Sequence, residues 1–77
     1  MDWVNGTLKT RNLRIQVTNK HIEKKGVWVV HIREFNWSCV PLGIPDESTV
    51  EEAQNEAVAM VRHHLHILIA ELSSYGK

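Results

Sequence analysis

The sequence contains a single cysteine, Cys39, only two prolines, and no long apolar run. A lone cysteine excludes an intramolecular disulfide and a tetracysteine metal site. No basic segment followed by an apolar one opens the chain, and no apolar stretch approaches the roughly 20 residues that a membrane span needs. We therefore expect an intracellular, cytoplasmic protein that does not bind to a membrane.

The sequence has no excess of charge of either sign, because its nine basic residues balance its nine acidic ones. No global field therefore draws the chain to nucleic acid or to an anionic membrane. Phosphate-binding glycine loops, nucleophile elbows and dinucleotide fingerprints do not occur in the sequence. A length of 77 residues suits one small domain. We expect one domain over residues 1–77 that is not an enzyme and has no cofactor.

A long helix is the clearest pattern in the sequence, and we expect it from Ser48 to about Leu72. Two overlapping capping boxes stand at its start, one of Ser48 with Glu51 and one of Thr49 with Glu52. Apolar residues then recur at steps of three and four, which predicts one stripe facing a core. The stripe consists of Val50, Ala53, Ala57, Val61, Leu65, Leu68 and Leu72.

Three strands are expected before this helix, at residues 13–18, 27–32 and about 39–42. The first alternates apolar and polar residues without error. The second is apolar almost throughout, which is typical of a central strand covered on both faces or of a strand with one face against a second subunit. Trp28 is our candidate for its core aromatic residue. Pro41 cannot donate to a sheet ladder and favours an edge position for the third strand. The pattern predicts an α+β fold in which one long C-terminal helix packs on a three-stranded antiparallel sheet.

The dipeptide Asn5-Gly6 stands between two short apolar-containing pairs, which is a hairpin signal. The pairs on either side are very short. The dipeptide could therefore be only a turn that leads into the first long strand.

Aromatic and apolar residues beyond the needs of one thin core point to a protein partner. The chain has three tryptophans, a residue type favoured in interfaces. The second half of the helix is apolar on more than one side, so a second surface should cover it. A homodimer is the simplest such cover. For a protein partner, the candidate contacts are Phe35, Trp37, Ile67 and Ile69.

The histidines offer an alternative, because His63 and His66 stand three apart on the helix and could share a metal ion. A third ligand would have to come from His21, His31 or Cys39. The two-histidine pattern of metalloproteases, with its adjacent glutamate, is missing. We expect a polar helix face here and no metal.

A second alternative is a nucleic-acid-binding module, because most basic residues lie in the first half of the chain. Such a module would hold phosphates with basic side chains and stack a tryptophan on bases. The candidates are Lys9, Arg11, Arg14, Lys24, Lys25 and Arg33. The ordinary reading is that these residues protect sheet edges from aggregation.

Several short motifs together resemble the HicB-like antitoxin domain. They are Gly26 followed by Trp28-Val29-Val30, then Cys39, then Gly43, and then the helix start Thr49-Val50-Glu51-Glu52-Ala53. The resemblance covers about residues 13–72. It implies a domain that binds and masks a small toxin ribonuclease of double-stranded-RNA-binding-like fold. Full antitoxins of this kind also carry a DNA-binding segment after the domain. The sequence shows none, so we expect a stand-alone or partial form.

Overall fold

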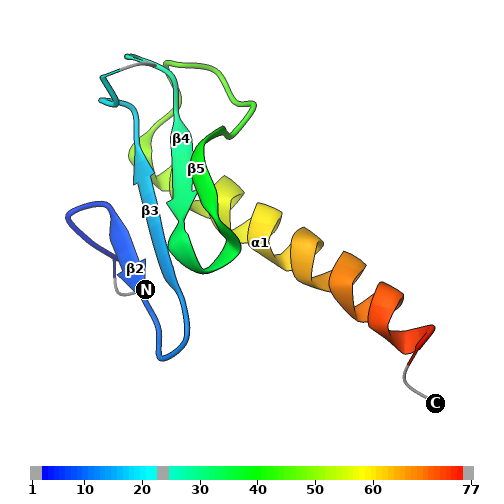
Figure 1. Cartoon of the computed structure of the whole chain (residues 1–77). Helices are drawn as coiled ribbons and strands as arrows, with labels where there is room; N and C mark the ends of the chain where they lie inside the picture. Colours follow the sequence, from blue (N-terminus) through cyan, green and yellow to red (C-terminus); the bar gives the residue numbers. More distant parts are fainter. Residues whose placement is uncertain (1–2, 23–24, 76–77) are drawn as a thin grey trace.

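A computed structural model describes residues 3–22 and 25–75 and shows an α+β fold (Figure 1). The sheet contains β1 (Trp3–Val4), β2 (Thr7–Lys9), β3 (Arg14–Thr18), β4 (Val29–Ile32) and β5 (Trp37–Pro41). Each strand pairs antiparallel with the next, in the order β1-β2-β3-β4-β5. A short 3-10 turn, η1 (Arg33–Phe35), joins β4 to β5, and the helix α1 (Val50–Ser73) follows. The predicted class and the single C-terminal helix are confirmed.

The prediction of three strands is wrong, since the sheet has five. The two further strands, β1 and β2, lie on either side of the Asn5-Gly6 turn. They form a true hairpin, with Val4 opposite Thr7. Asn5 and Gly6 both have positive φ angles, 52° and 79°, as a type I′ turn requires. The hairpin continues the sheet because β2 pairs with β3 along its whole length. Strands of two and three residues are too short to show a periodic pattern in the sequence.

Replacing Gly6 by alanine is expected to lower the free energy of unfolding by about 2 kcal/mol, measured by urea denaturation. A Cβ atom on Gly6 would stand 2.9 Å from the carbonyl oxygen of Val17, and φ there is +79°. The matched control is Gly43→Ala, where φ is +75° but nothing lies within 4 Å of the added atom. An equal loss in both variants would show that the close contact with Val17 costs nothing.

The first two predicted strands follow their patterns, although β3 begins one residue and β4 two residues later than expected. In β3, Ile15 and Val17 are buried while Arg14 and Gln16 are exposed. β4 lies between β3 and β5, and its continuous apolar character has the expected cause, because Val29, Val30 and Ile32 are fully buried. These two strands form the base of the core.

β5 is an edge strand, as Pro41 predicts, but it begins at Trp37, two residues before the expected start. A bulge interrupts its pairing with β4, since Val30 faces Val40 while Ile32 faces Trp37. Cys39 takes a left-handed φ of 57° in this bulge. Its backbone N–H donates to Nδ1 of His31, 3.1 Å away, so the histidine side chain replaces a ladder partner.

We expect His31 to make stability depend on pH. Burial, with a smaller effect of neighbouring His21, lowers the pKa of His31 below its ordinary value of 6.5. Well above pH 6.5 the residue is neutral in the folded and unfolded states. As the pH falls below 6.5, the unfolded chain takes up its proton first, so the free energy of unfolding decreases until the pH passes the folded pKa. Protonation of Nδ1 would also break the bond from Cys39.

Urea denaturation at several pH values between 7.5 and 5 tests this dependence. In His31→Asn, an amide oxygen can accept the bond without titrating. In His31→Asn the free energy of unfolding should fall much less than in wild type as the pH is lowered. In His21→Asn it should fall almost as much as in wild type. The same slope in wild type and His31→Asn would contradict the assignment.

The helix begins as one of the two predicted capping boxes requires. Thr49 is the N-cap; its side-chain oxygen accepts from the backbone N–H of Glu52 at 3.1 Å. Glu52 accepts in return from the backbone N–H of Thr49 at 2.8 Å. The alternative box that begins at Ser48 is not used, because the helix begins one residue later, with Thr49 as its N-cap. The carbonyl of Ser48 accepts a bond from Trp28.

The first three turns of α1 pack on the sheet through small side chains. Ala53 and Ala57 are fully buried, and Val61 is 5% exposed. Trp28 fills the core beside them, 5% exposed, and its indole N–H donates to the carbonyl of Ser48 at 3.1 Å. This confirms Trp28 as a core residue.

Beyond Val61 no helix residue is fully buried, and past Ile67 the helix extends beyond the sheet, toward the red end of the ribbon in Figure 1. The prediction of one continuous buried stripe is therefore wrong for Val50, Leu65 and Leu72, which are 52%, 40% and 66% exposed. The reason is length, because a helix of 24 residues is about 36 Å long and β3 has only five residues. The longest dimension of the molecule, 45 Å, reflects this overhang.

Within residues 3–22 and 25–75, no helix is both long enough and apolar enough to cross a membrane.

Candidate protein-interaction site

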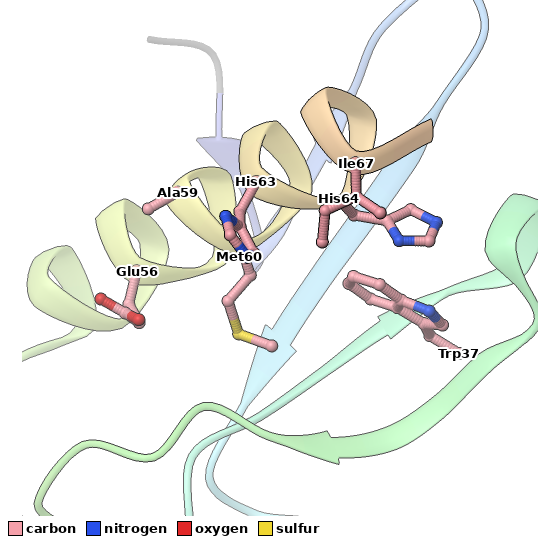
Figure 2. Close-up of a pocket in the computed structure, with 7 residues that line it drawn as sticks. All are labelled: Trp37, Glu56, Ala59, Met60, His63, His64 and Ile67. Atoms are coloured by element: carbon pink, nitrogen blue, oxygen red, sulfur yellow. The ribbon is translucent and has the colours of Figure 1, made fainter. Parts of the chain in front are cut away.

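A groove of about 460 Å³ lies between β5 and the middle of α1. Trp37 forms its sheet side, and six residues of α1 form the other: Glu56, Ala59, Met60, His63, His64 and Ile67 (Figure 2). In Figure 2 the indole of Trp37 lies across the groove from His64 and Ile67, with the Met60 side chain between the helix and the strand. We name this surface the Trp37 groove.

Three rings hold one end of the Trp37 groove together. The ring centroids of Phe35 and Trp37 are 5.3 Å apart in an edge-on arrangement. His64 lies against both, 4.9 Å from Phe35 and 5.2 Å from Trp37. Such contacts fix the rings and reduce the entropy that a partner must remove on binding. The Trp37 ring is therefore a preformed contact rather than a mobile side chain.

Local backbone geometry brings these rings together. Asn36 has a left-handed φ of 60°, and its N–H donates to the carbonyl of Arg33 at 3.0 Å, which closes η1. The turn places Phe35 and Trp37 on the same side, toward α1. On α1, positions 56, 60, 63 and 67 are three or four residues apart and share one face.

Three of the four predicted partner contacts meet at this site. Trp37 and Ile67 line the groove, and Phe35 touches it through its ring contacts. Ile69 does not belong to the groove, although it is 63% exposed. Sequence reasoning missed His64 and the other helix residues of the groove. Their helical spacing relative to Ile67 was the available signal.

Acidic residues lie next to the Trp37 groove, toward the start of α1. Glu56 lines the groove itself. About one turn earlier, exposed Glu52 lies on the same side of the helix as Glu56, whereas exposed Glu51 projects from nearly the opposite side. They carry negative charge at the positive end of the helix dipole. An apolar groove with an acidic flank is thus available on one side of the molecule.

Most of the basic candidates gather elsewhere, around the turn between β2 and β3. Lys9, Arg11, Arg14 and Arg33 surround a hollow of about 260 Å³. Glu34 also lines this hollow, and its carboxylate accepts from the backbone N–H of Arg14 at 3.3 Å. Lys25 is not part of the hollow, and Lys24 lies outside the described residues.

The metal alternative gains no third ligand. Among residues 3–22 and 25–75, no group of three or more histidine, cysteine or acidic side chains is placed to hold an ion. His63 lines the Trp37 groove, whereas His66 is exposed and does not line it. His21 and His31 stack on each other, with ring centroids 5.4 Å apart.

Comparison with known proteins gives no relative for this chain: no family model matches the sequence, and no similar curated protein or solved structure was found.

Proposed function

We propose that this protein is a non-enzymatic interaction module that binds another protein at the Trp37 groove. The observation that carries the proposal is the half-exposed indole of Trp37, fixed by Phe35 and His64 beside an apolar groove. Rigid aromatic residues in such settings supply much of the binding energy in protein interfaces. An apolar side chain of the partner would insert between Trp37 and Met60.

The acidic flank indicates the chemistry of the partner. Glu56 in the groove and exposed Glu52 one turn before it favour a basic surface, because complementary charge speeds encounter and excludes wrong partners. Proteins that act on RNA present such basic surfaces. The specific form of the proposal is therefore an antitoxin-like inhibitor that masks a small ribonuclease. This narrower form rests on the HicB-like sequence motifs together with the acidic flank.

Trp37→Ala is expected to weaken binding of the partner by about 2–4 kcal/mol, the usual effect of a central tryptophan. The matched control is Val4→Ala, which removes an apolar side chain that is 67% exposed on β1, outside the Trp37 groove. Each purified variant is used to capture proteins from the cells of its source, and its affinity for the protein bound by wild type is then measured by calorimetry. Ile67→Lys, a helix variant that changes no β5 residue, repeats the test in case Trp37→Ala folds poorly.

A ribonuclease assay completes the test. The captured protein is separated from wild type, and its cleavage of RNA is measured with and without each variant added back. We expect inhibition by wild type and Val4→Ala, and its loss with Trp37→Ala and Ile67→Lys. Equal binding by all four proteins would overturn the Trp37 groove as the site. Binding without any effect on RNA cleavage would overturn the inhibitor form alone.

A second candidate function is nucleic-acid binding, which the clustering of four basic residues around one hollow favours. Such binding should weaken steeply with salt, and Arg11→Ala together with Arg33→Ala should reduce the salt slope by about 2. Fluorescence anisotropy with labelled single-stranded RNA measures the slope. Absence of binding at low salt would eliminate this function and leave the protein-binding proposal intact.

A further inference from the structure

The face of the sheet that points away from α1 is polar. α1 packs on the other face, where Ile15, Val17 and Val30 are buried, and Figure 1 shows the helix on one side of the sheet only. At one end of the polar face Val29 is buried, and the rest carries exposed or half-buried side chains. Strand alternation places six such residues there, which we name the open sheet face: Thr7, Lys9, Arg14, Gln16, Thr18 and His31.

Two hollows lie along the open sheet face, with volumes of about 470 Å³ and 620 Å³. Because Gln16 lines both of them, they form one shallow trough. The trough follows β3 for about 13 Å, the length of four residue steps from Arg14 to Thr18. The other residues that argue for a ligand are Thr7, Lys9 and Arg14 in the first hollow and Lys20, His21 and His31 in the second.

The charge along this trough is positive. Lys9, Arg14 and Lys20 line it, and no acidic side chain does so among the residues that the structure describes. Lys9 and Arg14 stand directly opposite each other on neighbouring strands, and such a pair of like charges destabilises a sheet. Protection of a sheet edge does not account for Arg14, because β3 lies between β2 and β4. Glu34 accepts from the backbone N–H of Arg14, but it lines the separate hollow at the β2–β3 turn. An anionic ligand would offset the repulsion between the two cations.

A pair of stacked rings occupies the other part of the trough. His21 and His31 lie with their ring centroids 5.4 Å apart and their planes 29° from parallel. The backbone N–H of Cys39 donates to Nδ1 of His31 and so fixes the ring on β4. Histidine is one of the side chains on which unpaired RNA bases stack. Cations beside a flat pair of rings match the phosphates and bases of a single strand.

We propose that the open sheet face binds single-stranded RNA. The phosphates lie against Lys9, Arg14 and Lys20, and a base stacks on the rings of His21 and His31. A double helix fits this arrangement poorly, because a paired base is already stacked between its neighbours and is not accessible to the rings.

The polar residues between the cations and the rings favour RNA over DNA. Thr7 stands opposite Gln16, which stands opposite His31 in turn. The hydroxyl of Thr7 and the amide of Gln16 both donate and accept hydrogen bonds, as the ribose 2′-hydroxyl does. The inference rests on the second candidate function, nucleic-acid binding, and gives it a surface and a ligand. It is independent of the Trp37 groove, which lies on the side of the sheet that carries α1.

A charge introduced in the trough tests the surface. Binding of a labelled oligouridylate of roughly twelve nucleotides is measured by fluorescence anisotropy at pH 7.5 and about 50 mM salt. Gln16 is exposed, so Gln16→Glu should fold, and it should raise the dissociation constant about tenfold or more because its carboxylate repels phosphates. The matched control is Gln54→Glu, which adds the same charge on α1 and should change the dissociation constant less than about twofold. Equal effects of the two variants would overturn the open sheet face as the site.

His31→Asn tests the stacking. The amide oxygen still accepts from the N–H of Cys39, but the ring is lost. The dissociation constant for the single strand should rise about tenfold, with no change in its salt slope, because the lost contact carries no charge. The affinity for an RNA duplex of the same length should stay unchanged. An equal loss of affinity for single strand and duplex would overturn the stacking on the ring pair.

The remaining outcomes separate this inference from the candidate function on which it rests. Absence of binding at low salt would overturn both. Binding that weakens in Arg11→Ala with Arg33→Ala, but not in Gln16→Glu, would keep nucleic-acid binding at the turn and overturn the open sheet face. An oligodeoxyuridylate differs from the RNA probe only in lacking the 2′-hydroxyls, and we expect it to bind more weakly. Equal affinity for the two strands would overturn the selection of RNA.

Discussion

Replacing Trp28 by alanine is expected to unfold a large part of the protein at 25 °C. Trp28 is 5% exposed in the core, and the loss of a buried tryptophan costs about 3–5 kcal/mol. Loss of its bond to the carbonyl of Ser48 adds about 1 kcal/mol. A domain of 77 residues has only about 4–12 kcal/mol to lose. Far-ultraviolet circular dichroism and urea denaturation measure the effect.

Trp28→Phe separates the ring from its hydrogen bond. It keeps an aromatic side chain in the core but leaves the carbonyl of Ser48 without the indole donor. We expect this variant to stay folded, with a loss of about 1–2 kcal/mol. If Trp28→Ala were fully folded and had the same urea midpoint as Trp28→Phe, Trp28 would not organise the core.

Replacing Ala57 by leucine is expected to lower the free energy of unfolding by about 3 kcal/mol or more. Ala57 is fully buried between α1 and the sheet, so three added carbon atoms have no space. The helix must move away from the sheet to accommodate them. Urea denaturation measures the loss, and the tryptophan emission of the folded state should change because Trp28 is part of the same core.

Ala70→Leu is the matched control for this change. It makes the same substitution in the same helix, at an exposed position beyond the sheet. Alanine and leucine have similar helix propensities, so we expect a change within about 0.5 kcal/mol. If Ala57→Leu were as stable as Ala70→Leu, the close approach of α1 to the sheet would be wrong.

Strong local patterns allowed much of the fold to be predicted from the sequence. β3 was predictable because Ile15 and Val17 alternate with polar residues, and α1 because its cap and its spacing agree. The count of strands failed because β1 and β2 are too short for any periodicity, and only the turn at Asn5-Gly6 marks them. The burial of α1 failed because periodicity shows a helix face but not how far the opposing sheet extends.

The candidate site was only partly predictable for a related reason. Phe35, Trp37 and Ile67 were identifiable as apolar residues beyond the needs of the core. Their contact with His64 depends on η1, on the left-handed conformation of Asn36 and on the direction of α1 across the sheet. These are tertiary features that no local spacing encodes. The HicB-like motifs remain a sequence resemblance, and the ribonuclease assay tests what they imply.

The most direct test of the central claim is amide hydrogen exchange along α1 at low micromolar protein, where single chains dominate. The claim is that the sheet and the rings of Phe35 and Trp37 hold the helix as far as His64, and that the end of the helix lies beyond the sheet. We predict slow exchange for residues 53–64 and much faster exchange for residues 68–73, since an uncovered helix end frays. Equally slow exchange along the whole helix in the dilute protein would contradict the claim.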